Sequence, residues 1–217
     1  MAGRPSSRWL RLAFVIASLV AVTNVQSALA VLSDPVAIGG NTFTTSVWVC
    51  AGPGSQTVTA SADSWVNQSS TGQNNGSDAT LSVRSGSSAN RRTFVTFTLP
   101  ALPAACAVTS ATLRLFDSSP TVLRTINAQQ VAASWTESGI TWSNQPAGTG
   151  AVATSGTPLI AGWQSWTVTT QVQAMYSGAN NGFLVSDQSE NALLPAQQQY
   201  ASREASSNVP ELLVSWS

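Results

Sequence analysis

Short stretches in which apolar and polar residues alternate, separated by turn-forming residues, constrain the fold of this chain more than any other feature. In 93–99, Val95, Phe97 and Leu99 share one face and threonines occupy the other. A period of two is the spacing of a β-strand with one buried face. Many such segments, cut by Gly, Asn, Ser and Pro, are typical of an all-β sandwich of antiparallel strands. The predicted strands include 56–60, 81–84, 93–99, 111–116, 166–169, 182–185 and 212–216, with one short helical turn over 170–177.

The first thirty residues have a different pattern. Three arginines precede an apolar run, Leu12 to Val22, which is followed by small residues that end at Ala30. This order is typical of a secretory signal peptide, and the run is short for a bilayer span, which needs about 20 residues. We expect cleavage after Ala30, with an uncleaved membrane anchor as the alternative. The predicted organisation is a signal peptide over 1–30, an N-terminal extension over 31–57 and one folded domain over 58–217, in a secreted, extracellular protein.

The charge of the predicted mature chain is low and slightly negative. The whole sequence has no lysine and no histidine, and residues 31–217 hold six arginines against nine acidic residues, a formal net charge of −3. A nucleic-acid partner needs a basic face that releases phosphate counterions, and an anionic membrane attracts basic clusters. The composition therefore argues against both partners, and no membrane insertion is expected after signal cleavage.

Cys50 and Cys106 are the two cysteines of the chain. In an exported protein such a pair is most simply a disulfide. It would pin the N-terminal extension to the main domain. A metal pair or a catalytic thiol is the alternative, and neither would have a histidine to work with.

A series of short motifs follows the chain in a fixed order. In chain order they are Ala62-Asp63-Ser64-Trp65-Val66, Asn74-Asn75-Gly76-Ser77, Leu81-Ser82-Val83, Arg91-Arg92-Thr93-Phe94-Val95-Thr96-Phe97, Val108-Thr109-Ser110-Ala111-Thr112-Leu113-Arg114-Leu115, Trp135-Thr136-Glu137, Thr141-Trp142-Ser143-Asn144-Gln145-Pro146, Trp166-Thr167-Val168-Thr169, Asn180-Asn181-Gly182-Phe183-Leu184 and Ser202-Arg203-Glu204-Ala205. Each motif is short, but together they cover roughly Val58 to Ser217. The ordered set resembles one family of secreted domains, the DNRLRE domains, which are grouped with family 96 of the carbohydrate-binding modules.

The resemblance implies a jelly-roll β-sandwich that binds carbohydrate without catalysis. Some members of the family bind alginate or other acidic glycans. The expected partner of this chain is therefore a polysaccharide or cell-wall glycan. The alternative is a structural or adhesive surface protein that keeps the sandwich without a working sugar site.

The side chains available for catalysis are few. Acyl-transfer triads need a base that takes the proton of the nucleophile, most often histidine, and there is none. A lyase would have only Tyr176 and Tyr200 to use as a base. Paired carboxylates could serve a glycosidase, with the candidates Asp63, Glu137, Asp187 and Glu204, but their placement is open. We therefore predict a protein without enzymatic activity.

Sugar binding needs an aromatic ring for stacking and polar groups that satisfy the hydroxyls. The candidate rings are Trp163, Trp65 and Trp48, with core packing as the alternative for each. Arg84 and Arg114 lie on the polar faces of their predicted strands and could bind a carboxylate or two hydroxyls. A solvated surface arginine is the alternative for either.

Two further assignments concern the stability of the fold. Asp63, Asn74, Asn75 and Asp78 offer hard oxygen ligands near a loop and could hold a structural calcium ion; ordinary polar loop residues are the alternative. Arg92 and Glu204 both belong to family motifs, and we expect them to form a half-buried ion pair that fixes the fold.

Overall fold

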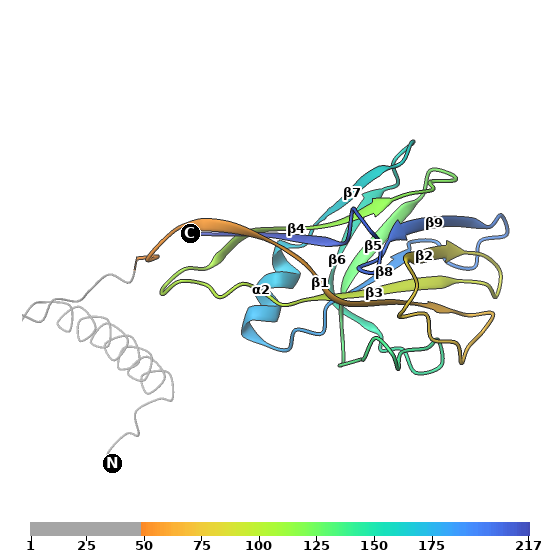
Figure 1. Ribbon diagram of the computed structural model, residues 1–217, viewed down its shortest axis with the longest axis horizontal. Coiled ribbons are helices and arrows are strands. Elements are labelled where there is room, and N and C mark those ends of the chain that lie inside the picture. Colours follow the sequence, from red (N-terminus) through yellow and green to blue (C-terminus); the bar gives the residue numbers. More distant parts are fainter. Residues whose placement is uncertain (1–48) are drawn as a thin grey trace, which may run out of the picture. The chain divides into compact units, whose positions relative to one another are not determined.

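The computed structural model describes residues 49–217, and Figure 1 shows a twisted antiparallel β-structure with one short helix. The strands in chain order are β1 (Gly54–Asn67), β2 (Thr80–Ser85), β3 (Arg91–Phe97), β4 (Val108–Asp117), β5 (Thr125–Val131), β6 (Gly148–Gly156), β7 (Gly162–Thr167), β8 (Phe183–Asp187), β9 (Ala196–Ala201) and β10 (Glu211–Trp216). The helix is α2 (Thr169–Ser177). None of the described residues forms a helix with the length and hydropathy that a bilayer span requires.

The strands form one continuous sheet that closes on itself. Six strands pair in the order β1-β10-β4-β9-β2-β3, and β3 pairs again with β1 to complete an antiparallel barrel. Strands β8, β5 and β6 continue outward from β3, and β7 pairs with β4. The all-β fold with one short helix is thus confirmed, whereas the jelly-roll sandwich is not what the pairing shows.

The length of β1 is the physical reason for this closure. Its first part, Gly54 to Thr59, pairs with β10. From Ala60 onward its partner is β3, and a bulge between Ala60 and Ala62 lies at the start of this second ladder. Bulges bend a strand and increase its twist, so a single strand connects two layers that would otherwise be separate sheets.

The disulfide between Cys50 and Cys106 is present, as predicted. It joins the segment before β1 to the connection between β3 and β4, 56 residues further along the chain. Figure 1 shows β1, β4 and β10 running together as a narrow arm that carries the C-terminus. The bond therefore ties this arm at its outer end. Trp48 and the predicted signal peptide lie outside the described residues.

The alternating residues of the strands fill the barrel as the sequence pattern predicts. The main core contains Leu113, Leu115, Trp166 and Tyr200, each buried. A second cluster around Phe94 and Leu184 lies on the other side of β3, where Trp135 and Trp142 cover it. Burial of such side chains contributes roughly 1.5–3 kcal/mol each. The two clusters show that β3 is buried on both faces.

Glycine is required at Gly182, just before β8. Its φ of +76° lies in the left-handed region, and a side chain there would collide with the backbone of Val95 and Thr96. The Gly182 carbonyl also accepts a hydrogen bond from the Val131 N–H, with an N–O distance of 3.0 Å. The Asn-Asn-Gly motif thus permits the close approach of the chain that positions β8 beside β3 and β5.

Candidate functional site

The outer surface of four adjacent strands, β7, β4, β9 and β2, carries most of the predicted sugar-binding residues. In the β4–β7 ladder Phe116 lies opposite Trp163, and in the β2–β9 ladder Arg84 lies opposite Gln197. Their neighbours along each strand, such as Leu115 and Val83, point inward and are buried. We call this surface, together with Arg91 of the adjoining strand β3, the polar face; its residues are Ser82, Arg84, Arg91, Arg114, Phe116, Trp163, Ser165, Gln197 and Gln199.

Trp163 and Arg114 form the part of the polar face on β7 and β4. The guanidinium carbon of Arg114 lies 4.4 Å from the centre of the Trp163 ring, a cation–π distance. Phe116 packs edge-on against the same ring with centroids 5.6 Å apart. The Arg114 Nη1 donates to Glu211 Oε2 at 3.1 Å. This stack fixes the guanidinium while part of its donor set stays open to solvent.

Arg84 and Arg91 form the opposite part of the polar face. They are paired residues of β2 and β3 in the ladder, so their side chains leave the sheet on the same side. The Arg91 guanidinium lies 4.8 Å from the Trp65 ring centre, and the Trp65 Nε1 donates to Asp78 Oδ2 at 3.0 Å. The structure thus brings Trp65 to this end of the polar face.

The two arginines lack carboxylate partners within residues 49–217. The Arg84 side chain makes no hydrogen bond or ion pair with another described residue, whereas Arg92, Arg114, Arg124 and Arg203 each pair with an acidic side chain. Arg91 donates only through Nη1, at 3.4 Å to Ser82 Oγ and to Gln197 Oε1, and its Nε is buried without a partner. Burial and the charge of Arg84 lower the pKa of Arg91. Two adjacent, unneutralised cations are suited to bind an anion.

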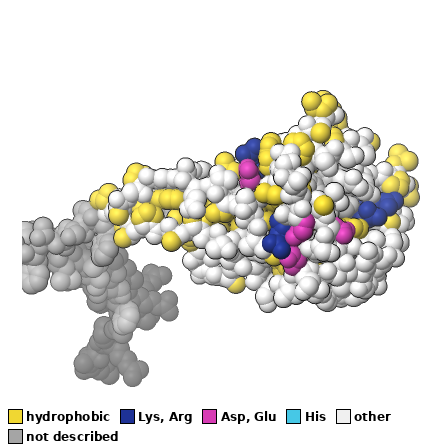
Figure 2. All heavy atoms as spheres, in the orientation of Figure 1, with side chains coloured by type: hydrophobic (Ala, Val, Ile, Leu, Met, Phe, Trp, Pro, Cys, Tyr) yellow, Lys and Arg dark blue, Asp and Glu magenta, His cyan; other side chains and the backbone are white. Residues whose placement is uncertain are grey.

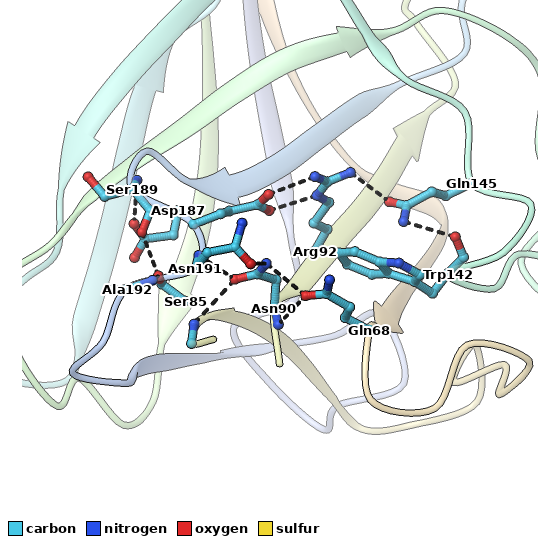
Figure 3. Close-up of polar contacts among 12 residues, drawn as sticks. Gln68, Ser85, Asn90, Arg92, Trp142, Gln145, Asp187, Ser189, Asn191 and Ala192 are labelled. Carbon is cyan, nitrogen blue, oxygen red and sulfur yellow. Dashed lines mark hydrogen bonds and ion pairs between the residues drawn. The ribbon is translucent and has the colours of Figure 1, made fainter. Parts of the chain in front are cut away.

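The predicted ion pair between Arg92 and Glu204 is wrong. Arg92 instead donates from Nε and Nη2 to the two carboxylate oxygens of Glu190, both at 2.7 Å, and from Nη1 to Gln145 at 3.3 Å (Figure 3). Glu204 pairs with Arg203, its neighbour in the sequence. The reason is the loop between β8 and β9, which places Glu190 over β3. Membership in a family motif indicates that each of these residues matters to the fold. It does not show which side chain pairs with which.

Three carboxylates, Asp63, Glu137 and Glu204, come within 4.8 Å of one another through one oxygen each. The Arg203 Nε lies 2.6 Å from Glu137 Oε1 and 2.8 Å from Glu204 Oε1. The Arg203 backbone N–H donates to Asp63 Oδ2 at 2.8 Å. Burial raises the pKa of Asp63 to about 7, the charges of Glu204 and Glu137 add to the rise, and the hydrogen bond from Arg203 opposes it.

This cluster does not gather the predicted calcium ligands. Of the four, only Asp63 belongs to it. The Asn75 side chain donates to the Trp65 carbonyl, the Asn74 side chain to the carbonyls of Glu137 and Ile140, and Asp78 accepts from Trp65. The Arg203 guanidinium already pairs with two of the three carboxylates, Glu137 and Glu204. The geometry favours an ion-pair cluster over a calcium site.

A cavity of about 400 Å³ lies away from the polar face, beside Trp135, Thr136 and Asn144. The Asn144 side chain is used within its own loop, accepting from Thr141 and donating to Gly139, and the Trp135 Nε1 donates to Asn181. This pocket is open to solvent, but the polar side-chain groups of Trp135 and Asn144 already have partners within the protein. It therefore offers fewer free polar groups than the polar face.

Among the residues of this site that sequence reasoning missed are Arg91, Gln197 and Gln199. Strand β9 was not among the predicted strands because Gln198, a polar residue, points inward and interrupts the alternation. The sequence shows Arg91 only as part of a motif. Whether it has a carboxylate partner depends on where the acidic side chains lie in the fold, and no sequence pattern gives their positions.

Comparison with known proteins gives the family. The chain matches the model of carbohydrate-binding module family 96 over residues 54–216, which is most of its length. A comparison with curated proteins finds no match. The ordered motifs, the all-β fold and this match agree, and the chain therefore belongs to carbohydrate-binding module family 96 and is a non-catalytic carbohydrate-binding module.

Proposed function

We propose that the polar face binds an acidic polysaccharide, with Arg84 and Arg91 holding a carboxylate group of the glycan. The observation that carries this is the pairing pattern of the arginines: four of the six described arginines are neutralised by carboxylates, and the two that are not face each other across β2 and β3. A guanidinium binds a carboxylate through two parallel hydrogen bonds. The charge of this surface is therefore positive, although the net charge of the whole chain is low.

The rest of the polar face supports binding of an extended chain. Strands in a sheet lie about 4.8 Å apart, so the span from β7 to β2 is about 14 Å. Between its two ends lie the amides of Gln197 and Gln199, which can donate to and accept from hydroxyl groups. The Trp163 ring, stacked with Arg114, supplies an apolar platform at the β7 end. We expect weak, shallow binding at several points along the glycan.

The test is affinity electrophoresis and calorimetry on matched polysaccharides. Alginate and polygalacturonate represent carboxylated chains, and xylan and cellulose derivatives represent neutral ones. We expect retention on the carboxylated chains, and a loss of about tenfold or more in affinity for Arg84→Gln with Arg91→Gln. The variant Arg203→Gln removes one positive charge from an ion pair outside the polar face and should keep its affinity. Equal retention on neutral chains by all variants would overturn the proposal.

We also propose that the protein is exported and cleaved after Ala30. The disulfide between Cys50 and Cys106 supports this, because such bonds persist in oxidising compartments. Mass spectrometry of the protein in the culture fluid should give a chain that begins at Val31. Recovery of the protein only with cells, with residues 1–30 intact, would contradict cleavage.

A further inference from the structure

Aliphatic side chains are unusually exposed on three loops at one end of the barrel. The loops are 118–124 between β4 and β5, 157–161 between β6 and β7, and 188–195 between β8 and β9. Their exposed fractions range from 51% to 91%, far above those of core residues. The six residues are Val122, Leu123, Leu159, Ile160, Leu193 and Leu194, out of eight large hydrophobic residues exposed in the described part of the chain.

Hydrogen bonds beneath the tips hold the loops in place. The Arg124 N–H donates to Thr157 Oγ1 and the Thr157 N–H donates to the Arg124 carbonyl, both at 2.9 Å. The Arg124 guanidinium binds both oxygens of Asp187, at 2.8 and 2.7 Å. Thr121 Oγ1 donates to the Gln197 carbonyl at 2.7 Å, which ties the first loop to β9. The exposure of the aliphatic residues is thus built into the fold.

The charges around these loops are positive or neutralised. Asp187 is paired with Arg124 and Glu190 with Arg92. Arg84 has no carboxylate partner among residues 49–217. It lies near the end of β2 beside the loop 188–195, since the next residue, Ser85, pairs with Ala196 at the start of β9. Figure 2 shows hydrophobic side chains projecting at the end of the molecule away from the arm, with basic side chains next to them. The exposed carboxylates of the Arg203 cluster belong to other segments.

We propose that these three loops enter the interfacial region of a lipid bilayer while Arg84 and Arg91 bind an anionic phospholipid headgroup. The loops 118–124 and 157–161 lie together, since residues of both line one small pocket. Exposed aliphatic tips beside two unneutralised arginines match the two components of an anionic membrane surface, its apolar interior and its acidic headgroups. Each aliphatic side chain transferred from water adds to binding, and basic residues near the surface add attraction to anionic lipids.

The inference rests on the proposed function in its use of Arg84 and Arg91, but the two can fail separately. The net charge of −3 argued against a membrane partner when averaged over the sequence. The structure places Arg84 and Arg91, the two arginines without a carboxylate partner among residues 49–217, beside the last of these loops, so the local charge differs from the average. The aliphatic tips lie outside the polar face, and the proposed glycan site does not use them.

The experiment places an environment-sensitive fluorophore on Leu159→Cys in the full chain and adds vesicles of phosphatidylcholine with or without phosphatidylglycerol. The matched control carries the fluorophore on Val152→Cys, a residue that is also exposed and aliphatic but lies in β6 outside the three loops. Because the fluorophore reports on its own surroundings, attachment through another segment leaves the loop signal unchanged. We expect a blue shift at position 159 and none at 152, strongest with phosphatidylglycerol.

Variants separate the two proposals. Leu159→Ser with Ile160→Ser should weaken vesicle partitioning by about tenfold or more while leaving affinity for alginate within about twofold. Arg84→Gln with Arg91→Gln should weaken both. Three results would overturn the inference: an unshifted signal at position 159, an equal shift at position 152, or concentration-dependent self-association that removes the vesicle effect. Failure to bind alginate, with the vesicle effect intact, would count only against the proposed function.

Discussion

Arg91 and Arg92 are consecutive residues of β3, so their side chains lie on opposite sides of the strand. They also differ in whether a carboxylate neutralises their charge. Each guanidinium lies 4.8 Å from the centre of a tryptophan ring, Trp65 for Arg91 and Trp142 for Arg92. Arg92 satisfies Nε, Nη1 and Nη2 with Glu190 and Gln145. Arg91 has only two contacts of 3.4 Å through one nitrogen.

The difference teaches that an arginine stacked on tryptophan is not by itself a binding site. On the Arg92 side a carboxylate completes the arrangement, so the group stabilises the fold and joins the β8–β9 loop to β3. On the Arg91 side no described carboxylate does so, and the second cation, Arg84, lies beside it. An external anion can take the place that Glu190 takes on the other side.

The largest expected effect is on stability, at Arg92. Arg92→Gln leaves the half-buried Glu190 carboxylate without its partner, and we expect the free energy of unfolding to fall by about 3 kcal/mol. Chemical denaturation measures this. Arg91→Gln is the matched control and should change stability by less than about 0.5 kcal/mol. Similar losses for both variants would remove the contrast between the two sides.

The next largest effect is on ligand affinity and its dependence on salt. The affinity of the native chain for alginate should fall steeply as ionic strength rises, because attraction between exposed charges is screened. Arg84→Gln with Arg91→Gln should lower the affinity by about 30-fold at low salt and flatten the salt dependence. Calorimetry over a salt series checks both. A variant that binds more weakly but keeps the native salt slope would place the anion site elsewhere.

Stability should also depend on pH through the buried carboxyls. The pKa of Asp63 is raised to about 7 and that of Asp117 to about 6 by burial, against a usual value of 3.8. The folded state therefore binds protons at these two groups more tightly than the unfolded state. Their contribution to stability is complete below about pH 4 and is lost as the pH rises through about 6 to 7. We expect the free energy of unfolding to decline over this interval by an amount set by the two shifts, at about 1.4 kcal/mol for each pKa unit.

Denaturation midpoints between pH 4 and pH 8 measure this decline. Asp63→Asn removes one of the two carboxyls and should flatten the profile. A midpoint that rises over the same interval, in native chain and variant alike, would show that other groups dominate the titration.

The smallest expected effect is at the β7 end of the polar face. Trp163→Ala removes the ring beneath Arg114 and should lower affinity for the polysaccharide by about fivefold. Trp142→Ala, on the Arg92 side, should lower stability and leave the affinity of the folded protein unchanged. Binding measured below the unfolding transition separates the two. Loss of affinity at Trp142 alone would move the sugar site to the other side of β3.

The sequence predicts much of the fold because alternation reports burial directly. The segments around Val95, Leu113 and Leu212 alternate cleanly, and each lies in a strand. Strands β5, β6 and β9 were not predicted. In β5 and β9 the inward or half-buried positions include glutamines, and β6 consists mostly of small and exposed residues. Their hydrogen bonds to the rest of the sheet, rather than their own hydrophobic pattern, place them.

The candidate site was predicted in part for a similar reason. Trp163, Arg84 and Arg114 follow from the phase of their strands, and the structure places all three on the polar face. Trp65 reaches the polar face through its contact with the Arg91 guanidinium. The calcium ligands and the Arg92–Glu204 pair were grouped by motif alone, and motifs carry no information about distances between loops.

The sequence by itself determined the fold class, the disulfide, the family and the absence of histidine and lysine chemistry, because each depends on residue type and local order. The tertiary structure alone decided which arginines are neutralised. Charge pairing depends on distances of a few ångströms between residues as far apart in the chain as Arg92 and Glu190, or Arg124 and Asp187. Coulombic attraction acts through space and not along the chain, so only the closed sheet could show that Arg84 and Arg91 have no carboxylate partner among residues 49–217.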